Sequence, residues 1–264
     1  MSNSHTITRP DVFRDYPKVR KIGVADLKQA LAEGFSDFSA MPSHLVFLGL
    51  IYPAAGIWLV IGNPLPLLFP LLSGFALIGP FAAIGLYEVS RRRELGLDAS
   101  WKNAFGVVRS HSMFPILSLG LLLLVIFACW EFTALALYRS LFGSAWPQSF
   151  TQFAGDIFGT SQGWKLIGFG TATGFVFAVL ALSVSVVSFP MLLDRDVDVP
   201  TAILTSVKAV LVNPITLALW GLIVAASLAV GFLLVFAGLA VVVPVLAHST
   251  WHLYRKLVEP AGLG

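Results

Sequence analysis

Charged residues are scarce in this chain of 264 residues, and cysteine is almost absent. Only 12% of the residues are Asp, Glu, Lys or Arg, against roughly 25% in a soluble domain, whereas 57% are hydrophobic. The single cysteine, Cys129, excludes an intramolecular disulfide and a cysteine-based metal site. The composition therefore predicts a membrane protein and argues against thiol chemistry.

Enzyme motifs are missing as well. The chain has no glycine-rich nucleotide loop, no nucleophile elbow and no zinc-protease signature, so we expect no enzymatic activity, no catalytic residue and no cofactor. The formal net charge is +3, but the basic residues stand at the ends of apolar segments, which argues against nucleic-acid binding. Residues 1–22 are polar, lack the features of a secretory signal, and are expected to form a cytoplasmic tail.

What the chain does have is long apolar runs, each close to or above the roughly 20 residues that cross a bilayer as a helix. Lipid tolerates only helices and closed barrels, and the runs lack the alternation of barrel strands. We therefore predict an all-α fold, a polytopic membrane helical bundle with six transmembrane helices. The predicted spans are 44–61, 64–87, 115–138, 164–193, 214–236 and 239–254.

The basic residues orient these spans. Fifteen of the seventeen Lys and Arg residues fall on one side of the predicted membrane, with only Arg139 and Lys165 on the other. Because positive charge stays on the cytoplasmic side, we expect a multi-pass protein of the bacterial inner membrane with both termini in the cytoplasm. Residues 139–163 form the predicted outer loop, whose aromatic residues suit the membrane surface.

An internal repeat appears when the chain is aligned on Pro42, Pro115 and Pro214, each of which opens a predicted span. An amphipathic stretch precedes each proline, and the middle copy is the weakest. Residues 23–264 then form one membrane domain of three hairpin units, 23–96, 97–195 and 196–258, each starting with a cytoplasmic amphipathic helix. Alternatively, any amphipathic helix before a span has this pattern. The aligned apolar residues are Leu27, Leu31, Phe35 and Phe38 in the first unit and Val199, Ile203, Val207 and Val210 in the third.

Three sequence strings at span ends point to a family: GLYEVSRR at 85–92, FPMLLDR at 189–195 and WHLYR at 251–255. Over about residues 21–258 the chain resembles the uncharacterised bacterial integral membrane proteins of domain of unknown function 2189. The resemblance implies a multi-pass membrane protein. It supplies no activity, so it transfers no catalytic residue.

The same span ends hold most of the candidate functional residues. Twelve of the fourteen acidic residues lie on the basic side, Asp37 and Glu94 among them, so this face is a mixed-charge surface. We call its candidate residues the polar collar and expect them to pair with one another, with anionic lipid or with a membrane-protein partner. The polar collar comprises Tyr87, Glu88, Arg91, Arg92, Asp194, Arg195, His252, Tyr254 and Arg255.

Two further groups are candidates for chemistry. His248 and His252 stand four apart, so they share a helix face and can hold a metal or haem with His44 or His111; the alternative is hydrogen bonding to a neighbouring helix. Glu131 is the only acidic residue inside the predicted spans away from their cytoplasmic ends. It is a candidate proton relay or ion site, or a side chain that reaches the outer headgroups.

The leading functional hypothesis is a structural or accessory membrane protein that binds a partner or lipid at its cytoplasmic face. An alternative is a transporter or channel for a small solute or ion, in which Pro80, Pro190 and Pro244 break helices around a path lined by Ser183, Ser185 and Glu131. A second alternative is a haem- or metal-binding membrane subunit. Gly170 and Gly174 have the spacing of close helix packing.

Overall fold

The structure is a computed structural model that describes residues 17–40, 66–68, 70–72, 79–80, 83–100, 112–234 and 237–260. Within these ranges the regular structure is helical, apart from one isolated β-bridge between Val19 and Val258. The predicted all-α class is confirmed for this part of the chain. Its main helices are α1 (Val24–Ser39), α4 (Ile84–Glu94), α6 (Met113–Phe142), α7 (Phe150–Gly159), α8 (Ser161–Ser185), α9 (Ser188–Asp194), α10 (Val199–Val212), α11 (Pro214–Leu233) and α12 (Leu239–Leu257).

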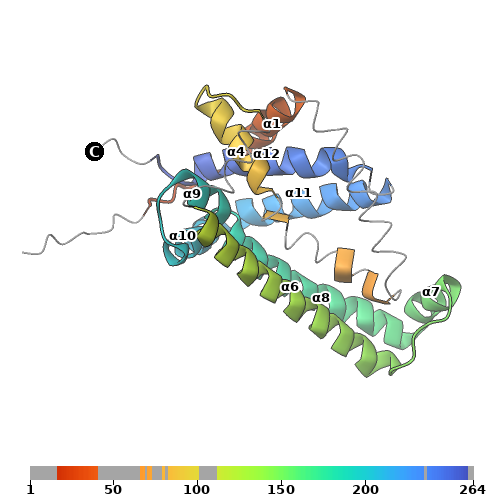
Figure 1. Ribbon diagram of the computed structural model, residues 1–264. Coiled ribbons are helices and arrows are strands. Elements are labelled where there is room, and N and C mark those ends of the chain that lie inside the picture. Colours follow the sequence, from red (N-terminus) through yellow and green to blue (C-terminus); the bar gives the residue numbers. More distant parts are fainter. Residues whose placement is uncertain are drawn as a thin grey trace, which may run out of the picture.

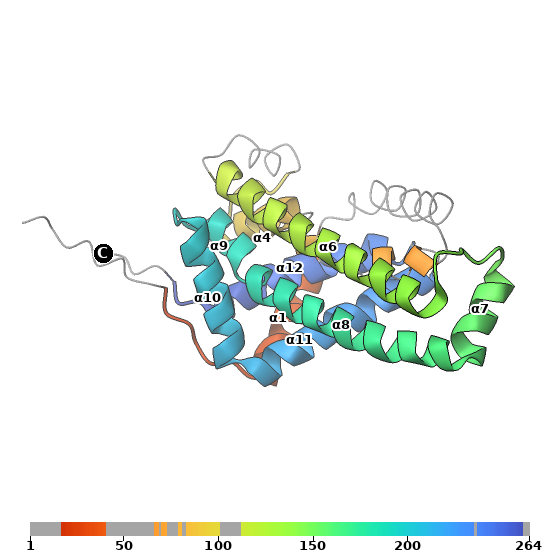
Figure 2. The same ribbon diagram turned by 90° about the horizontal axis from the view of Figure 1, so that it is seen from below.

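The longest helices, α6 and α8, lie side by side and run in opposite directions (Figures 1 and 2). The short helix α7 lies where they are joined, at one end of the molecule, and α9 and α10 follow α8 at the other end. Helices α1 and α4 pack on α12, and α11 runs along α12. We call the end with α9, α10 and the C-terminus of α12 the collar end, and the end with α7 the loop end.

Three described segments are long and apolar enough to cross a membrane: α6, the combined segment Ser161–Asp194, and α11. They coincide with the predicted spans 115–138, 164–193 and 214–236. Large apolar side chains on all three are exposed, including Phe132, Phe175 and Ile215. An apolar surface of this extent is typical of helices that face lipid.

The other three predicted spans have different outcomes. The first, at 44–61, lies outside the described residues, and the second, at 64–87, is described only in short pieces, at 66–68, 70–72, 79–80 and 83–87. The sixth, at 239–254, lies within α12, which is not one of the three candidate spans. Polar residues interrupt its apolar run, and two of them, His248 and Ser249, are fully buried. The fold therefore surrounds α12 with other helices.

Side-chain caps explain where three helices begin. Ser149 accepts a hydrogen bond from the backbone of Gln152 at the start of α7, and Thr160 does the same for Gly163 at the start of α8. Asp198 caps α10 by accepting from the backbone of Thr201. Each cap satisfies one of the amide groups that a helix start leaves without a partner.

The fourth span is interrupted between α8 and α9, at Val186 and Val187. Pro190 lacks an amide proton, and its ring clashes with the carbonyl group four residues earlier, which belongs to Val186. The interruption lies inside the protein, and the amide of Val187 donates to the hydroxyl of Ser206 on α10 at 3.2 Å. The predicted helix break at Pro190 therefore lies inside the protein, and the amide of Val187 at the break donates a hydrogen bond to the neighbouring helix α10.

The predicted apolar stripe of α1 is only partly its buried face. Leu27 and Phe38 are buried, Leu31 is half-buried, and Phe35 is 57% exposed. The buried positions follow the line Leu27, Ala30, Gly34, Asp37 and Phe38. Small residues occupy the middle of this face because they let α1 approach α12 closely.

Helix α10 shows the same offset. Its buried residues are mostly small or hydroxylated, whereas Val199, Ile203, Val207 and Val210 are half-buried. The predicted amphipathic stripe of α10 therefore lies at the edge of the face that α10 packs against the neighbouring helices. Most of the stretch expected to form the middle copy lies outside the described residues. The buried residues of α10 are Thr201, Ala202, Thr205, Ser206 and Ala209.

Gly174 packs α8 against α6. A Cβ at this position would lie 3.1 Å from the ring of Trp130, tighter than ordinary van der Waals contact. Trp130 is 4% exposed, and its ring nitrogen donates to the carbonyl of Pro70 at 3.0 Å. The glycine spacing in the fourth span thus serves close packing.

Residues 18–22, near the N-terminal end of the described chain, pair with residues near its C-terminal end. The amide of Arg20 donates to the carbonyl of Leu257 at 2.8 Å, beside the bridge between Val19 and Val258. Asn213, at the corner between α10 and α11, accepts from the amide of Ile22 at 2.8 Å and donates to the carbonyl of Arg20 at 3.0 Å. One buried amide side chain therefore fixes both the N-terminal segment and this helix corner.

Candidate functional site

Helix α1 crosses α12 at Gly34, where the two backbones nearly touch. A Cβ on Gly34 would lie 2.5 Å from the backbone nitrogen of Ser249 and 2.7 Å from its Cα. A larger residue does not fit without displacing a helix, because the neighbouring atoms belong to the backbone. This approach brings Glu33 and Asp37 of α1 within reach of polar side chains on α12.

Four polar side chains form a hydrogen-bonded chain across α1, α4 and α12. Nδ1 of His248 lies 2.8 Å from Oγ of Ser90, which donates to Oδ2 of Asp37 at 2.5 Å; Nε2 of His252 lies 2.8 Å from the same Oδ2. Ser90 and His248 are fully buried, and Asp37 is 6% exposed. Since the single hydroxyl proton of Ser90 goes to Asp37, Nδ1 of His248 must donate to Ser90.

Asp37 is the acceptor that joins these helices. Nη1 of Arg93 lies 3.0 Å from its Oδ1 and also donates to the carbonyl of Ser36 at 3.2 Å. Burial raises the pKa of Asp37, but the hydrogen bonds from His252 and Ser90 and the charge of the nearby histidines outweigh it, so its pKa lies below the ordinary 3.8. The side chain is therefore a carboxylate at neutral pH, paired with Arg93.

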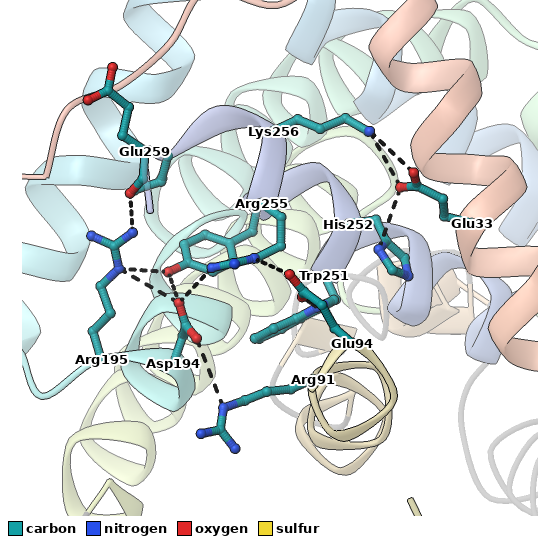
Figure 3. Close-up of polar contacts among 12 residues, drawn as sticks. Glu33, Arg91, Glu94, Asp194, Arg195, Trp251, His252, Arg255, Lys256 and Glu259 are labelled. Carbon is teal, nitrogen blue, oxygen red and sulfur yellow. Dashed lines mark hydrogen bonds and ion pairs between the residues drawn. The ribbon is translucent and has the colours of Figure 1, made fainter. Parts of the chain in front are cut away.

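A second network centres on Asp194 at the end of α9 (Figure 3). Its Oδ2 accepts from the hydroxyl of Tyr254 at 2.7 Å and lies 3.3 Å from Nη1 of Arg255. Nε of Arg195 donates to the same hydroxyl at 3.1 Å, and Nε of Arg91 lies 4.0 Å from Oδ1 of Asp194. Four other residues of the predicted polar collar thus meet around the carboxylate of Asp194.

Glu94 connects the end of α4 to α12. Its Oε1 lies 2.9 Å from Nε of Arg255, and its Oε2 accepts from the ring nitrogen of Trp251 at 3.0 Å. Burial by itself lowers the pKa of Arg255. The carboxylates of Glu94 and Asp194 outweigh this effect, so the pKa of Arg255 lies above its ordinary value. Arg255 therefore stays charged and bridges α4, α9 and α12.

The remaining collar residues on α4 have local roles. Glu88 is 5% exposed and pairs with Nε of Arg92 at 2.8 Å and Nη1 of Arg91 at 3.2 Å. Tyr87 is 2% exposed and lies in the hydrophobic core. The structure places Tyr87 away from the surface that the sequence analysis expected it to line.

An open pocket of about 440 Å³ lies between α1, α4 and α12. On one side of it, Nζ of Lys256 lies 3.4 Å from Oε2 of Glu33, and Nδ1 of His252 lies 3.5 Å from the same atom (Figure 3). We call this the collar pocket; every side chain that lines it is ionisable. The lining residues are Glu33, Asp37, Arg93, Glu94, His252, Arg255 and Lys256.

The two histidines of α12 have hydrogen-bonding roles in this geometry. His248 contacts Ser90, and His252 contacts Asp37 and Glu33. Among the residues that the structure describes, no group of three or more His, Cys, Asp or Glu side chains is arranged to hold a metal ion. His44 and His111, the other candidate ligands, lie outside the described ranges.

Glu131 and the serines of the fourth span lie at different depths. Gly174 packs beside Trp130, and Ser185 is eleven residues farther along α8, about 16 Å at helical rise. Ser185 donates to the carbonyl of Ala181 in its own helix at 2.6 Å. Oε1 of Glu131 is buried without a hydrogen-bond partner in the described part of the chain. Ser185 and Glu131 are therefore separated along the bundle by about 16 Å.

Helix α1 supplies the part of the collar pocket that was hardest to predict from the sequence: Glu33 was not expected, and Asp37 was expected only as an acid among basic residues. Arg93, Glu94 and Lys256 stand in the same charged span-end segments, 87–94 and 251–256, as the residues of the polar collar. Asp37 did carry a signal. It stands three residues after Gly34 and seven after Ala30, so it continues a line of small residues on one helix face. A carboxylate in such a line requires partners from the facing helices.

The model of a protein family described as Predicted integral membrane protein (DUF2189) matches residues 68–194. Over this segment, slightly less than half of the chain, the protein is similar to the DUF2189 family. The match contains the string at 85–92 and all but the last residue of the string at 189–195, and it confirms the resemblance. It is narrower than the expected extent of 21–258 and leaves out the string at 251–255.

Searches of the curated proteins and of the solved structures found no match. The DUF2189 match and the three long apolar helices together identify an integral membrane protein. The DUF2189 segment contributes Ser90, Arg93, Glu94 and Asp194 to the polar networks, whereas α1 and α12 lie outside it. The collar pocket therefore combines the family segment with both flanking regions.

Proposed function

We propose that this protein is a six-span bacterial inner-membrane protein, with both termini in the cytoplasm, that acts as a structural or accessory component. It binds a lipid or a membrane-protein partner at its cytoplasmic face. The observation that carries this proposal is the assembly of two polar networks and the collar pocket from α1, α4, α9 and α12 (Figure 3).

The β-bridge between Val19 and Val258 supports an even number of spans. Two bridged residues lie on the same side of any membrane, so the chain between them crosses it an even number of times. The described residues contain three candidate spans, which is an odd number, so the bridge favours at least one more crossing.

Helix α12 is the natural return crossing for α11. Asn213 at the start of α11 is hydrogen-bonded to Arg20, and Leu257 at the end of α12 is hydrogen-bonded to the same residue. If α11 crosses the membrane, α12 must cross back. The sequence expected two more spans at 44–61 and 64–87, which brings the total to six, in three hairpin units with amphipathic helices at the cytoplasmic face.

Charge supports the orientation. Arg139 is near the end of α6 and Lys165 near the start of α8, both at the loop end. Arg195, Lys208, Arg255 and Lys256 belong to the segments at the collar end. The positive-inside rule therefore assigns the collar end to the cytoplasm.

The polar chain supports a binding or structural role over catalysis. Ser90, His248 and Asp37 are the residue types of a hydrolase triad, but Ser90 is fully buried and donates its proton directly to Asp37. In a working triad the serine proton goes to the histidine, and substrate reaches the hydroxyl. The arrangement is instead suited to fixing α1 and α4 on α12.

The experiment is purification of the full-length protein in mild detergent with its native lipids, followed by identification of the lipids and proteins that copurify. Wild type is compared with Arg255→Gln at the collar end and with the control Lys165→Gln at the loop end. We expect a defined lipid or partner to be retained by wild type and Lys165→Gln and lost from folded Arg255→Gln. Solute or ion flux into proteoliposomes that Glu131→Gln abolishes would instead establish the transporter alternative.

A further inference from the structure

The collar pocket carries both signs of charge in equal number. Its lining contains three carboxylates and three permanent cations, together with one histidine. Helix α1 supplies only acids, Glu33 and Asp37, whereas α12 supplies Arg255 and Lys256. A ligand with charge of one sign therefore meets repulsion from half of the lining, and a ligand with both signs meets a partner for each.

The cations keep donors for a ligand. In contacts among the described residues, Arg93 uses Nη1, and Arg255 uses Nε and Nη1. A guanidinium group has five N–H donors in a planar fork that fits phosphate oxygens. Lys256 pairs with Glu33 only at 3.4 to 3.5 Å, a long contact that an oxyanion can replace.

The acids offer a complementary site. The side chain of Glu33 is 36% exposed at the pocket wall, and it pairs with Lys256 and His252 on α12. A primary ammonium group has three donors and can reach Glu33 while an attached phosphate takes the place of the carboxylate at Lys256. This exchange keeps every buried charge paired, as burial of charge requires.

The geometry points to the collar pocket as a binding site for a phosphate ester that carries a primary amine, the phosphoethanolamine group. The source of the group is either a lipid headgroup or a free molecule. The lipid source rests on the proposed function, which places the collar end at the cytoplasmic surface of the membrane.

The test uses the full-length protein in dodecyl maltoside and titration calorimetry with short-chain lipids. We expect dihexanoyl phosphatidylethanolamine to bind at least about tenfold more tightly than the choline and glycerol analogues, because each analogue loses the charge-assisted hydrogen bonds of the primary amine. Free phosphoethanolamine that binds as tightly as the lipid assigns the site to the free ester, and weaker binding assigns it to the lipid. The inference is overturned if the choline or glycerol lipid binds as tightly as the ethanolamine lipid, or if no lipid binds at all. It is also overturned if the free amino acid glycine, which has both charges but no phosphate, binds more tightly than phosphoethanolamine.

Two variants place the binding in the pocket. Glu33→Gln should reduce the preference for the ethanolamine lipid over the glycerol lipid by about tenfold, and Lys256→Gln should weaken both lipids by a similar factor. The exposed residues Asp196 and Lys208 supply the matched controls Asp196→Asn and Lys208→Gln, which should bind like wild type. Thermal unfolding verifies that each variant is folded, and unchanged binding in folded Glu33→Gln and Lys256→Gln contradicts the site.

The inference and the proposed function fail in different ways. Labelling of a cysteine introduced by Asp196→Cys from the outside of intact cells would contradict the proposed orientation and leave the binding result standing. Absence of binding in the presence of the correct orientation would refute the phosphoethanolamine site alone.

Discussion

Replacement of Asp37 by asparagine removes one charge from the junction of α1, α4 and α12 and preserves the side-chain shape. The carboxylate accepts from Ser90 at 2.5 Å and from His252 at 2.8 Å, and each hydrogen bond to a charged group is worth about 1.5 to 3 kcal/mol. The side chain of Arg93 is 32% exposed, so solvent reduces its pair with Asp37 to at most about 1 kcal/mol. Because asparagine keeps some of these bonds, we expect Asp37→Asn to lower the free energy of unfolding by about 2 to 4 kcal/mol.

The assay is reversible unfolding of the purified protein in mixed micelles, followed by tryptophan fluorescence. Asp196→Asn is the control, because Asp196 is exposed at the same end of the molecule, and it should change the unfolding free energy by less than about 0.5 kcal/mol. If Asp37→Asn has an effect as small as this control, the buried chain of hydrogen bonds does not hold the three helices together.

The pH dependence provides a second readout of the same residue. The pKa of Asp37 is lower in the folded protein than its ordinary 3.8, so the folded state favours the carboxylate. The stability that Asp37 supplies is complete above its unfolded pKa and is lost as pH falls below 3.8 and through the folded value. Wild type should therefore lose more stability than Asp37→Asn when the pH is lowered through this window, and parallel curves would contradict the assignment.

Two further predictions concern the backbone contacts that position the site. Gly34→Ala should destabilise the protein by about 1 to 3 kcal/mol because its Cβ overlaps the backbone of Ser249. Gly168→Ala, where no atom lies within 4 Å of the added Cβ, is the control, and equal thermal unfolding of the two variants would disprove the close crossing. Asn213→Ala should release residues 18–22 by removing the acceptor and donor that hold them, at a cost of about 1 to 3 kcal/mol. Faster trypsin cleavage after Arg20 in this variant is the expected result, and an unchanged cleavage rate would refute it.

The long helices were predictable from the sequence because crossing a bilayer requires about 20 apolar residues in a row. The runs at 115–138 and 214–236 agree with α6 and α11 to within a few residues. The interruption between α8 and α9 was less predictable, because Pro190 acts on a carbonyl four residues earlier, so the break stands upstream of the proline.

The sequence predicted that acidic and basic side chains gather at the collar end, but it predicted only some of the residues that form the candidate site. Arg91, Asp194, Arg195, Tyr254 and Arg255 meet as one network, since all stand at or beyond the ends of segments that return to the same end of the molecule. The contribution of α1 was not predictable from apolar periodicity, because its buried face depends on how closely a glycine lets two backbones approach. That approach is a property of the pair of helices and leaves no pattern in either one alone.

Cysteine accessibility measures whether the collar end faces the cytoplasm, as we propose. In a Cys129→Ala background, single cysteines are introduced by Asp196→Cys at the collar end and by Ser144→Cys in the segment between α6 and α7 at the loop end; both positions are exposed. We predict that a membrane-impermeant maleimide labels Ser144→Cys in intact spheroplasts and Asp196→Cys only in inside-out vesicles. Labelling of both cysteines from one side, or the reverse pattern, would show that the collar end does not face the cytoplasm.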